Sequence, residues 1–260
     1  MSPLVEAVRH GRAVTVTLND PSRRNALGHA MFDALDTALA TVREWAAAGA
    51  DQALILRLRG AGPAFCAGFD LEACVGDEGQ RVLASFLERL SSTVRALRRG
   101  PWVIVAEVQG AALAGGCALL SACDFVVVAE SAQLGYPVHR IGVSPAVTAP
   151  LLSVAMGPGA ARALLLSGEL ISGIEAMRRG LATHAVVDGD LGPTVDSLCA
   201  RLLRSGPVAL LATRRWLDQL DDSDENDRFD AALRASLSRC GSDESTQLLS
   251  AFWHSRRPRP

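Results

Sequence analysis

The sequence predicts an α/β core followed by an α-helical C-terminal region. Runs with strand character alternate with helical patterns through most of the 260-residue chain, whereas only helical patterns follow Leu191. In addition, two turns rich in Gly and Ala, at 65–71 and 110–124, each follow a run typical of a buried strand. Small residues at such turns allow a ligand to approach the backbone closely, so these turns are the first candidates for a functional site.

The N-terminal part of the chain is expected to alternate strands and helices. Residues 13–19 alternate in polarity and are β-branched, which predicts a strand, and a loop with turn chemistry follows it. Apolar residues recur at helical spacing over 31–45 and again over 82–97, which predicts two amphipathic helices. Between these helices, residues 54–58 form a short apolar run that predicts a buried strand.

The middle of the chain adds further strands before the helical region begins. Residues 103–108 and 125–130 are mostly apolar and rich in β-branched residues, and both predict buried strands. Short helical patterns broken by Pro and Gly follow Gly142, and 184–188 is the last strand candidate. The acidic run at 221–227 is expected to separate two helices of the C-terminal region as a solvated cap or loop.

Composition places the chain among ordinary globular proteins. Apolar residues make up 49% and charged residues 21%, and the net charge of −2 gives no indication of nucleic acid or an anionic membrane as a partner. No apolar stretch is long and uncharged enough to span a bilayer, and the N-terminus lacks a signal-peptide pattern. The six cysteines show neither CxxC nor zinc-ligand spacing, so we expect no metal and a cytoplasmic location.

Several short motifs recur here in a fixed order, although each Gly-rich turn alone is a weak functional signal. They are NDPSRRNALG, FCAGFDL, GAALAGGCALLSACDFVVVAESAQLG, IGVSPA and AMRRGLATHAVV. Together they closely resemble the crotonase superfamily of enoyl-CoA hydratases, isomerases and relatives, over nearly the whole chain. The resemblance implies a crotonase-like ββα superhelix core at 1–190. It also implies an α-helical C-terminal oligomerisation region at 191–260 and a homo-trimer or hexamer.

The resemblance also implies roles for particular residues. Two backbone N–H groups, those of Ala67 and Gly115, would form an oxyanion hole for the enolate of an acyl thioester. The structural alternative for both positions is close packing of helix against strand. Asp70 has a second reading as the N-cap of the following helix. The residues expected to contact CoA or the acyl chain are Arg24, Ala26, Leu27, Gly68, Phe69, Asp70, Leu71, Gly116 and Val138.

Two departures from the family pattern bear on the chemistry. Hydratases carry a Glu after Gly-Cys in the second turn and another Glu after a later Pro, and this chain has Ala118 and Val138 at those positions. A general acid or base contributes about 10²–10⁴-fold to rate, so losing two would remove roughly four to eight orders of magnitude if they act independently. The pattern therefore disfavours a two-Glu hydratase and a one-Glu isomerase.

Three other side chains near the turns could replace the missing groups. His139 follows Val138 and titrates in a useful range, although a His beside Arg140 is more typical of a surface. Tyr136 is the only tyrosine, and a lone Tyr in an apolar strip is more typical of packing. Cys117 could be a nucleophile at a helix N-terminus, but its surroundings are typical of a buried thiol.

The sequence therefore supports two functional hypotheses. The first is an enzyme that acts on an acyl-CoA or an acyl carrier protein, with no cofactor other than the CoA or phosphopantetheine thioester of its substrate. Decarboxylation of a β-carboxylated thioester fits, because loss of CO₂ forms the enolate without a Glu base, and some polyketide β-branching relatives perform such a step. The alternative is a non-catalytic acyl-CoA-binding homologue or a structural subunit.

Overall fold

The computed structural model describes residues 2–47, 54–222 and 226–256 of the chain. At its centre lies a six-stranded sheet with the order β1-β2-β3-β4-β6-β9. The first two strands form an antiparallel hairpin, and every other neighbouring pair in this sheet is parallel. These strands are β1 Val5–His10, β2 Ala13–Leu18, β3 Ile55–Gly60, β4 Val103–Val108, β6 Phe125–Ala129 and β9 His184–Val186.

A second, smaller sheet has three short strands in the order β5-β7-β8. They are β5 Ala111–Leu113, β7 Gln133–Gly135 and β8 Leu170–Ser172. The chain reaches β5 directly after β4 and β7 directly after β6, so two parallel strands of the main sheet each continue into the small sheet. The segments that follow β3, β4 and β6 thus lie close together, because an isolated bridge joins Cys66 to Ala112 in β5, and β5 pairs with β7.

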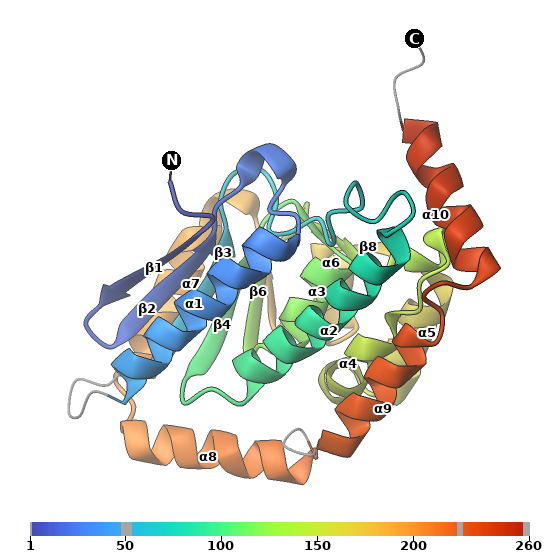
Figure 1. Cartoon of the computed structure of the whole chain (residues 1–260). Helices are drawn as coiled ribbons and strands as arrows, with labels where there is room; N and C mark the ends of the chain where they lie inside the picture. The colour runs from blue at the N-terminus through green and yellow to red at the C-terminus, as the bar shows by residue number, and fades with distance from the viewer. Residues whose placement is uncertain (1, 48–53, 223–225, 257–260) are drawn as a thin grey trace.

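Helices cover both faces of the main sheet. α1 (His29–Ala46) and α2 (Gly79–Arg98) lie side by side over one face (Figure 1). α7 (Leu191–Leu203) contacts β3, β4 and β6 on the other face. α1 adopts this position because Phe32, Leu35 and Leu39 recur at helical spacing and are all buried. The central strand β4 has helices on both sides, which accounts for its uninterrupted burial.

The rest of the described chain is mostly helical. It comprises α3 Gly115–Ser121, α4 Ala149–Met156, α5 Pro158–Ser167, α6 Gly173–Arg178, α8 Pro207–Leu220, α9 Asn226–Leu237, α10 Asp243–Arg256, and the 3-10 turns η1 Pro21–Arg23, η3 Pro137–Ile141, η4 Pro145–Thr148 and η5 Asp188–Asp190. α9 packs on α2 and η4, and α10 packs on η3, so helices from the end of the chain return to the middle segments. None of the described helices combines the length and the hydrophobicity needed to cross a bilayer.

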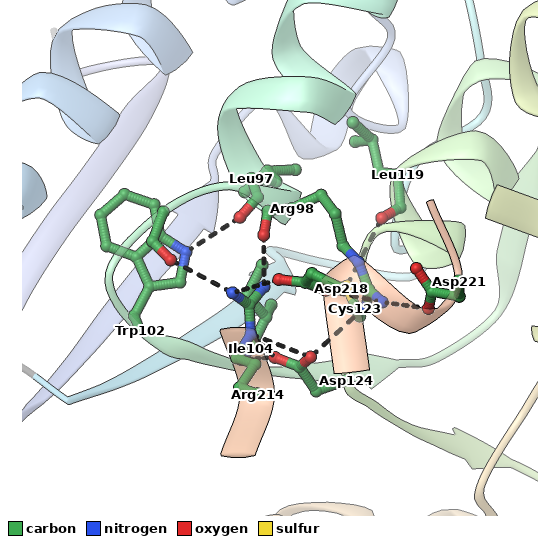
Figure 2. Close-up of polar contacts among 11 residues, drawn as sticks. Leu97, Arg98, Trp102, Ile104, Leu119, Cys123, Asp124, Arg214, Asp218 and Asp221 are labelled. Carbon is green, nitrogen blue, oxygen red and sulfur yellow. Dashed lines mark hydrogen bonds and ion pairs between the residues drawn. The ribbon is translucent and has the colours of Figure 1, made fainter. Parts of the chain in front are cut away.

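Charged side chains of α8 form its buried contacts with the core. The only residues that α8 buries are Arg214 and Asp218. Arg214 contacts Asp124 at 2.8 Å through Nε and donates to the carbonyl oxygen of Arg98 at 2.5 Å. The Arg98 guanidinium in turn contacts Asp218 at 2.8 Å and Asp221 at 3.1 Å (Figure 2). Burial raises the pKa of Asp218, although Arg98 and Arg214 act in the opposite direction.

The structure confirms the α/β core followed by helices, and it adds strands that the sequence patterns did not predict. These are β1, whose residues alternate weakly, and the three-residue strands β5, β7 and β8, which are too short to show a period. Asp70 does not cap a helix. Turns follow it, and α2 begins only at Gly79 with Glu78 as its N-cap residue. The expectation of a helix directly after the first Gly-rich turn is therefore wrong.

Candidate active site

One buried side chain organises the first loop of the site. Asn25 is fully buried, and its amide nitrogen donates to the carbonyl oxygens of Ala61 (3.0 Å), Ala64 (2.9 Å) and Phe65 (3.1 Å). Its Oδ1 accepts from the N–H of Asp20 at 2.8 Å. Asn25 also has a φ of 57°, a conformation that Asn tolerates better than most residues. Sequence reasoning did not single out Asn25, although an Asn within a turn-rich loop was the available signal.

The loop held by Asn25 pairs with the first Gly-rich turn. The N–H of Leu27 donates to the carbonyl oxygen of Gly68 at 2.8 Å, and the N–H of Asp70 donates to the carbonyl oxygen of Leu27 at 3.0 Å. Since C=O and N–H point in opposite directions across a trans peptide, the N–H of Phe69 points away from Leu27. None of the hydrogen bonds of the described residues uses this N–H. Phe69 therefore presents an unpaired backbone donor.

Ala67, which the sequence predicted as a donor, has no free N–H. Its N–H donates to the carbonyl oxygen of Arg24 at 3.0 Å. The direction in which the backbone N–H groups point reverses at Gly68, whose φ is +92°. A Cβ at Gly68 would stand 2.9 Å from the carbonyl oxygen of Leu113, so this position also needs glycine on steric grounds. The available amide of the first turn consequently belongs to Phe69.

The second Gly-rich turn supplies another unpaired donor. Gly115 is the first residue of α3, and its N–H takes part in no hydrogen bond of the described residues, as is usual for a first helical turn. Ala114 precedes it with a φ of 49° and a ψ of −111°, which is rare for a residue with a Cβ. A Cβ at Gly115 would stand 3.2 Å from Cε1 of Phe69, so the two turns are in close contact.

Both turns open on one cavity of about 290 Å³. Phe69 and Gly115 line it, and so do Ala118 and Val138. Most other lining residues are apolar and come from α2, α10 and the segment that spans η3 and η4, including Leu87, Leu90, Ile141, Val143, Val147 and Phe252. Among the described residues that line the cavity there is no carboxylate and no imidazole. Two amide donors at an apolar cavity can stabilise negative charge that develops on an oxygen, but no carboxylate or imidazole of the described lining accompanies them.

Of the three side chains proposed as substitutes, Tyr136 lines the cavity, where its hydroxyl pairs with Thr148, whereas His139 and Cys117 are not among the lining residues. His139 is exposed and does not line the cavity, and its Nδ1 lies 3.6 Å from the position that a Cβ on Gly168 would take. The structure therefore places the expected acid or base on the surface. Burial raises the pKa of the Cys117 thiol to about 12, which does not suit a nucleophile.

The other residues expected to contact a ligand fall into three sets. Arg24, Phe69 and Leu71 line the cavity, and the Arg24 side chain is exposed. Asp70 instead pairs with Arg23 at 2.6 Å. The remaining four, which are not among the lining residues, are Ala26, Leu27, Gly68 and Gly116. A Cβ at Gly116 would stand 2.2 Å from the carbonyl oxygen of Cys66, so that glycine has a steric role.

Comparison with known proteins agrees with this architecture. The family model for enoyl-CoA hydratase/isomerase matches residues 9–259. An enoyl-CoA hydratase homologue of Thermus thermophilus is 32% identical, and the match covers 97% of this chain and 98% of the relative. Rat enoyl-CoA hydratase domain-containing protein 3 is 27% identical, with 94% and 79% covered. The crystal structure of an enoyl-CoA hydratase from Mycobacterium avium superposes with a TM-score of 0.83 at 27% identity, covering 99% of both chains.

Proposed function

The chain belongs to the enoyl-CoA hydratase/isomerase family, and from this membership and its cavity we propose that it binds an acyl thioester. The thioester oxygen accepts hydrogen bonds from the amides of Phe69 and Gly115, and the acyl chain fills the apolar cavity. The two unpaired N–H groups support this arrangement, because each is a donor without a partner at the wall of one cavity. The thioester is carried by CoA or by the phosphopantetheine of a carrier protein.

The proposed reaction forms an enolate without a protein base. The observation that carries it is the pair of amide donors in a cavity whose described lining has neither carboxylate nor imidazole. In a thioester whose α-carbon carries a carboxylate, as in malonyl-CoA, the bond between the α-carbon and the carboxylate breaks and CO₂ leaves. The electron pair moves to the thioester oxygen, where the two amides stabilise it, and the α-carbon later takes a proton from water. Such a decarboxylation needs no side chain to remove a proton.

A second candidate function is binding without catalysis. The same absence of acid and base side chains from the described cavity lining favours it. In this case the protein holds an acyl-CoA or serves as a structural subunit, and the amides of Phe69 and Gly115 contribute to affinity only. Release of CO₂ from a β-carboxylated thioester distinguishes the two functions.

The exposed groups around the site suggest how the rest of the ligand and other subunits are bound. Arg24 lines the cavity with an exposed guanidinium, whose planar donor arrangement suits a CoA phosphate. We also propose a homo-trimer or hexamer in the cytoplasm. Large apolar side chains on α8 support self-association, since Trp216, Leu217 and Leu220 are more than half exposed.

Calorimetry and product detection test the proposed function. Titration with acetyl-CoA and butyryl-CoA should show saturable binding with a Kd in the micromolar to millimolar range, about −8 to −4 kcal/mol. Incubation with malonyl-CoA or methylmalonyl-CoA should release CO₂ and leave the shortened thioester. Binding without CO₂ release would favour the non-catalytic function. Absence of binding to every acyl-CoA, together with no binding to an acyl carrier protein, would contradict the thioester site itself.

A further inference from the structure

Two buried hydroxyl groups lie together in the wall of the same cavity. The oxygen of Tyr136 and Oγ1 of Thr148 are 3.1 Å apart, and each residue is only 1% exposed. Tyr136 is the residue before η3 and Thr148 is the last residue of η4, and both line the cavity. The neighbouring Gly135 accepts a hydrogen bond at 2.8 Å from the N–H of Ala114, the residue before Gly115. The backbone next to Tyr136 is therefore paired with the turn that presents the Gly115 amide, and both Tyr136 and Gly115 line the same cavity.

Counting hydrogens and acceptors in this pair shows that one of the two hydroxyl hydrogens lacks a strong acceptor. Two hydroxyls have two hydrogens, and one hydrogen bond between the two oxygens uses one of them. The other polar group that contacts the pair is the Cys117 thiol, which is hydrogen-bonded to Tyr136. Sulfur is a weak acceptor. An oxygen atom of a ligand would therefore be a better partner for the second hydroxyl hydrogen than any group that the described protein offers.

The two hydroxyls differ from the other polar side chains of the cavity lining in being buried. Arg24 and Arg140 also line the cavity but are exposed, and Ser144 is partly exposed. Among the described lining residues, only Tyr136 and Thr148 carry polar side chains that are almost completely buried. The remaining wall is mostly hydrocarbon, which binds saturated and oxygenated chains without distinguishing them by hydrogen bonds.

We propose that the Tyr136–Thr148 pair is a specificity site that binds an oxygen atom on the acyl chain, such as a hydroxyl or oxo group a few carbons from the thioester. This inference rests on the proposed function, because the acyl chain must enter the cavity from a thioester held at Phe69 and Gly115. The preferred ligand class is thus an oxygenated acyl thioester rather than a plain hydrocarbon one. A site whose hydrogen-bonding groups lie in an apolar wall favours ligands that can pair with those groups over ligands that leave them unpaired.

The pair is a binding site and not a proton-transfer site. Burial, the largest cause, raises the pKa of Tyr136 well above its usual value, so the phenol stays neutral over the physiological range. A neutral hydroxyl donates or accepts a hydrogen bond without giving up its proton. The test below therefore measures affinity and does not depend on turnover.

Matched thioesters and isosteric variants test this site. Calorimetry compares butyryl-CoA with 3-hydroxybutyryl-CoA and 4-hydroxybutyryl-CoA on the wild type, Tyr136→Phe and Thr148→Val. We expect one hydroxylated ligand to bind the wild type about 5- to 10-fold more tightly than butyryl-CoA, which is the usual effect of one hydrogen bond. In both variants this preference should fall below about twofold, with the affinity for butyryl-CoA little changed. Thr37→Val on the exposed surface of α1 is the control and should keep the preference.

The outcomes separate this inference from the function on which it rests. If the wild type binds all three ligands equally, or if both variants keep the preference, the specificity site is wrong while the thioester site stands. If none of the three ligands binds, the thioester site fails and the specificity site fails with it. Circular dichroism shows whether a variant is folded, and its affinity for butyryl-CoA shows whether its cavity is intact.

Discussion

Leu27 and Phe69 form an isolated parallel β-bridge, and this pairing directs the N–H of Phe69 away from Leu27. We predict that Phe69→Pro, which removes this N–H, lowers CO₂ release from malonyl-CoA by about 10²-fold, the usual effect of losing one oxyanion donor. Phe69→Leu keeps the amide and is the matched control, so it should lose much less. Equal losses in the two variants would show that the aromatic ring matters and the amide does not.

The missing carboxylates predict a very slow hydratase. Because Ala118 and Val138 line the cavity and cannot transfer protons, the wild type should hydrate crotonyl-CoA barely above background. Ala118→Glu with Val138→Glu should give measurable hydration, which the absorbance of the conjugated thioester follows. Each single Glu variant is the control and should be less active than the double one. Rapid hydration by the wild type would mean that another group transfers the protons.

The Asn25 side chain should be important for stability as well as for the site. Asn25→Gly keeps the backbone conformation but leaves three carbonyl oxygens without their donor, and it should lower the free energy of unfolding by about 2–4 kcal/mol. Asn25→Ala should cost roughly 1 kcal/mol more, because a Cβ is unfavourable at a φ of 57°. Denaturant unfolding measures both values. A loss below 1 kcal/mol in Asn25→Gly, roughly one ordinary hydrogen bond, would contradict this role.

The charged cluster under α8 predicts a specific pH dependence. The pKa of Asp218 is raised in the folded state, so its stabilising contribution is complete at low pH and is lost as the pH rises through the raised value. The neutral variant Asp218→Asn lacks this loss. Its free energy of unfolding relative to the wild type should therefore increase as the pH rises above about 4, the usual Asp range.

Denaturant unfolding at several pH values checks this difference. Arg98, Arg214, Asp124 and Asp221 surround the Asp218 carboxylate, and the Asn variant keeps all four of these charged neighbours. Asp33→Asn is the control, since that carboxylate is 69% exposed. A stability difference between Asp218→Asn and the wild type that does not vary with pH would show that the carboxyl group titrates normally.

The apolar surface of α8 predicts self-association. Trp216 is 59% exposed and Leu220 is 63% exposed, and a second copy of the chain would cover them. Light scattering at micromolar concentration should show a trimer or hexamer, and Trp216→Ser with Leu220→Ser should shift it toward smaller species. Gln219→Ser, at an exposed position between them, should leave the mass unchanged. A monomeric wild type would overturn the proposed assembly.

The α/β core with its helical C-terminal region and the position of Gly115 after a strand followed from the sequence alone, whereas β1, β5, β7 and β8 did not. Buried strands such as 103–108 are short runs in which only Glu107 is not apolar, and amphipathic helices such as α1 repeat their apolar residues at a period that no strand shares. Gly115 lies between a strand and an apolar helical run, so the sequence already places its N–H in a first helical turn, where backbone donors lack partners. These signals are local, because they depend on neighbouring residues only.

The tertiary structure alone decided which amide and which side chains face the cavity. The Ala67 N–H is paired because Arg24 comes from a distant loop, and Phe69 is unpaired because Leu27 holds the Gly68 carbonyl from the same loop. His139 lies on the surface, whereas Tyr136 meets Thr148 inside the cavity wall. Each of these outcomes depends on a peptide orientation or a contact between residues far apart in the chain. Residue type and periodicity do not encode such contacts, so only packing of the assembled fold determines them.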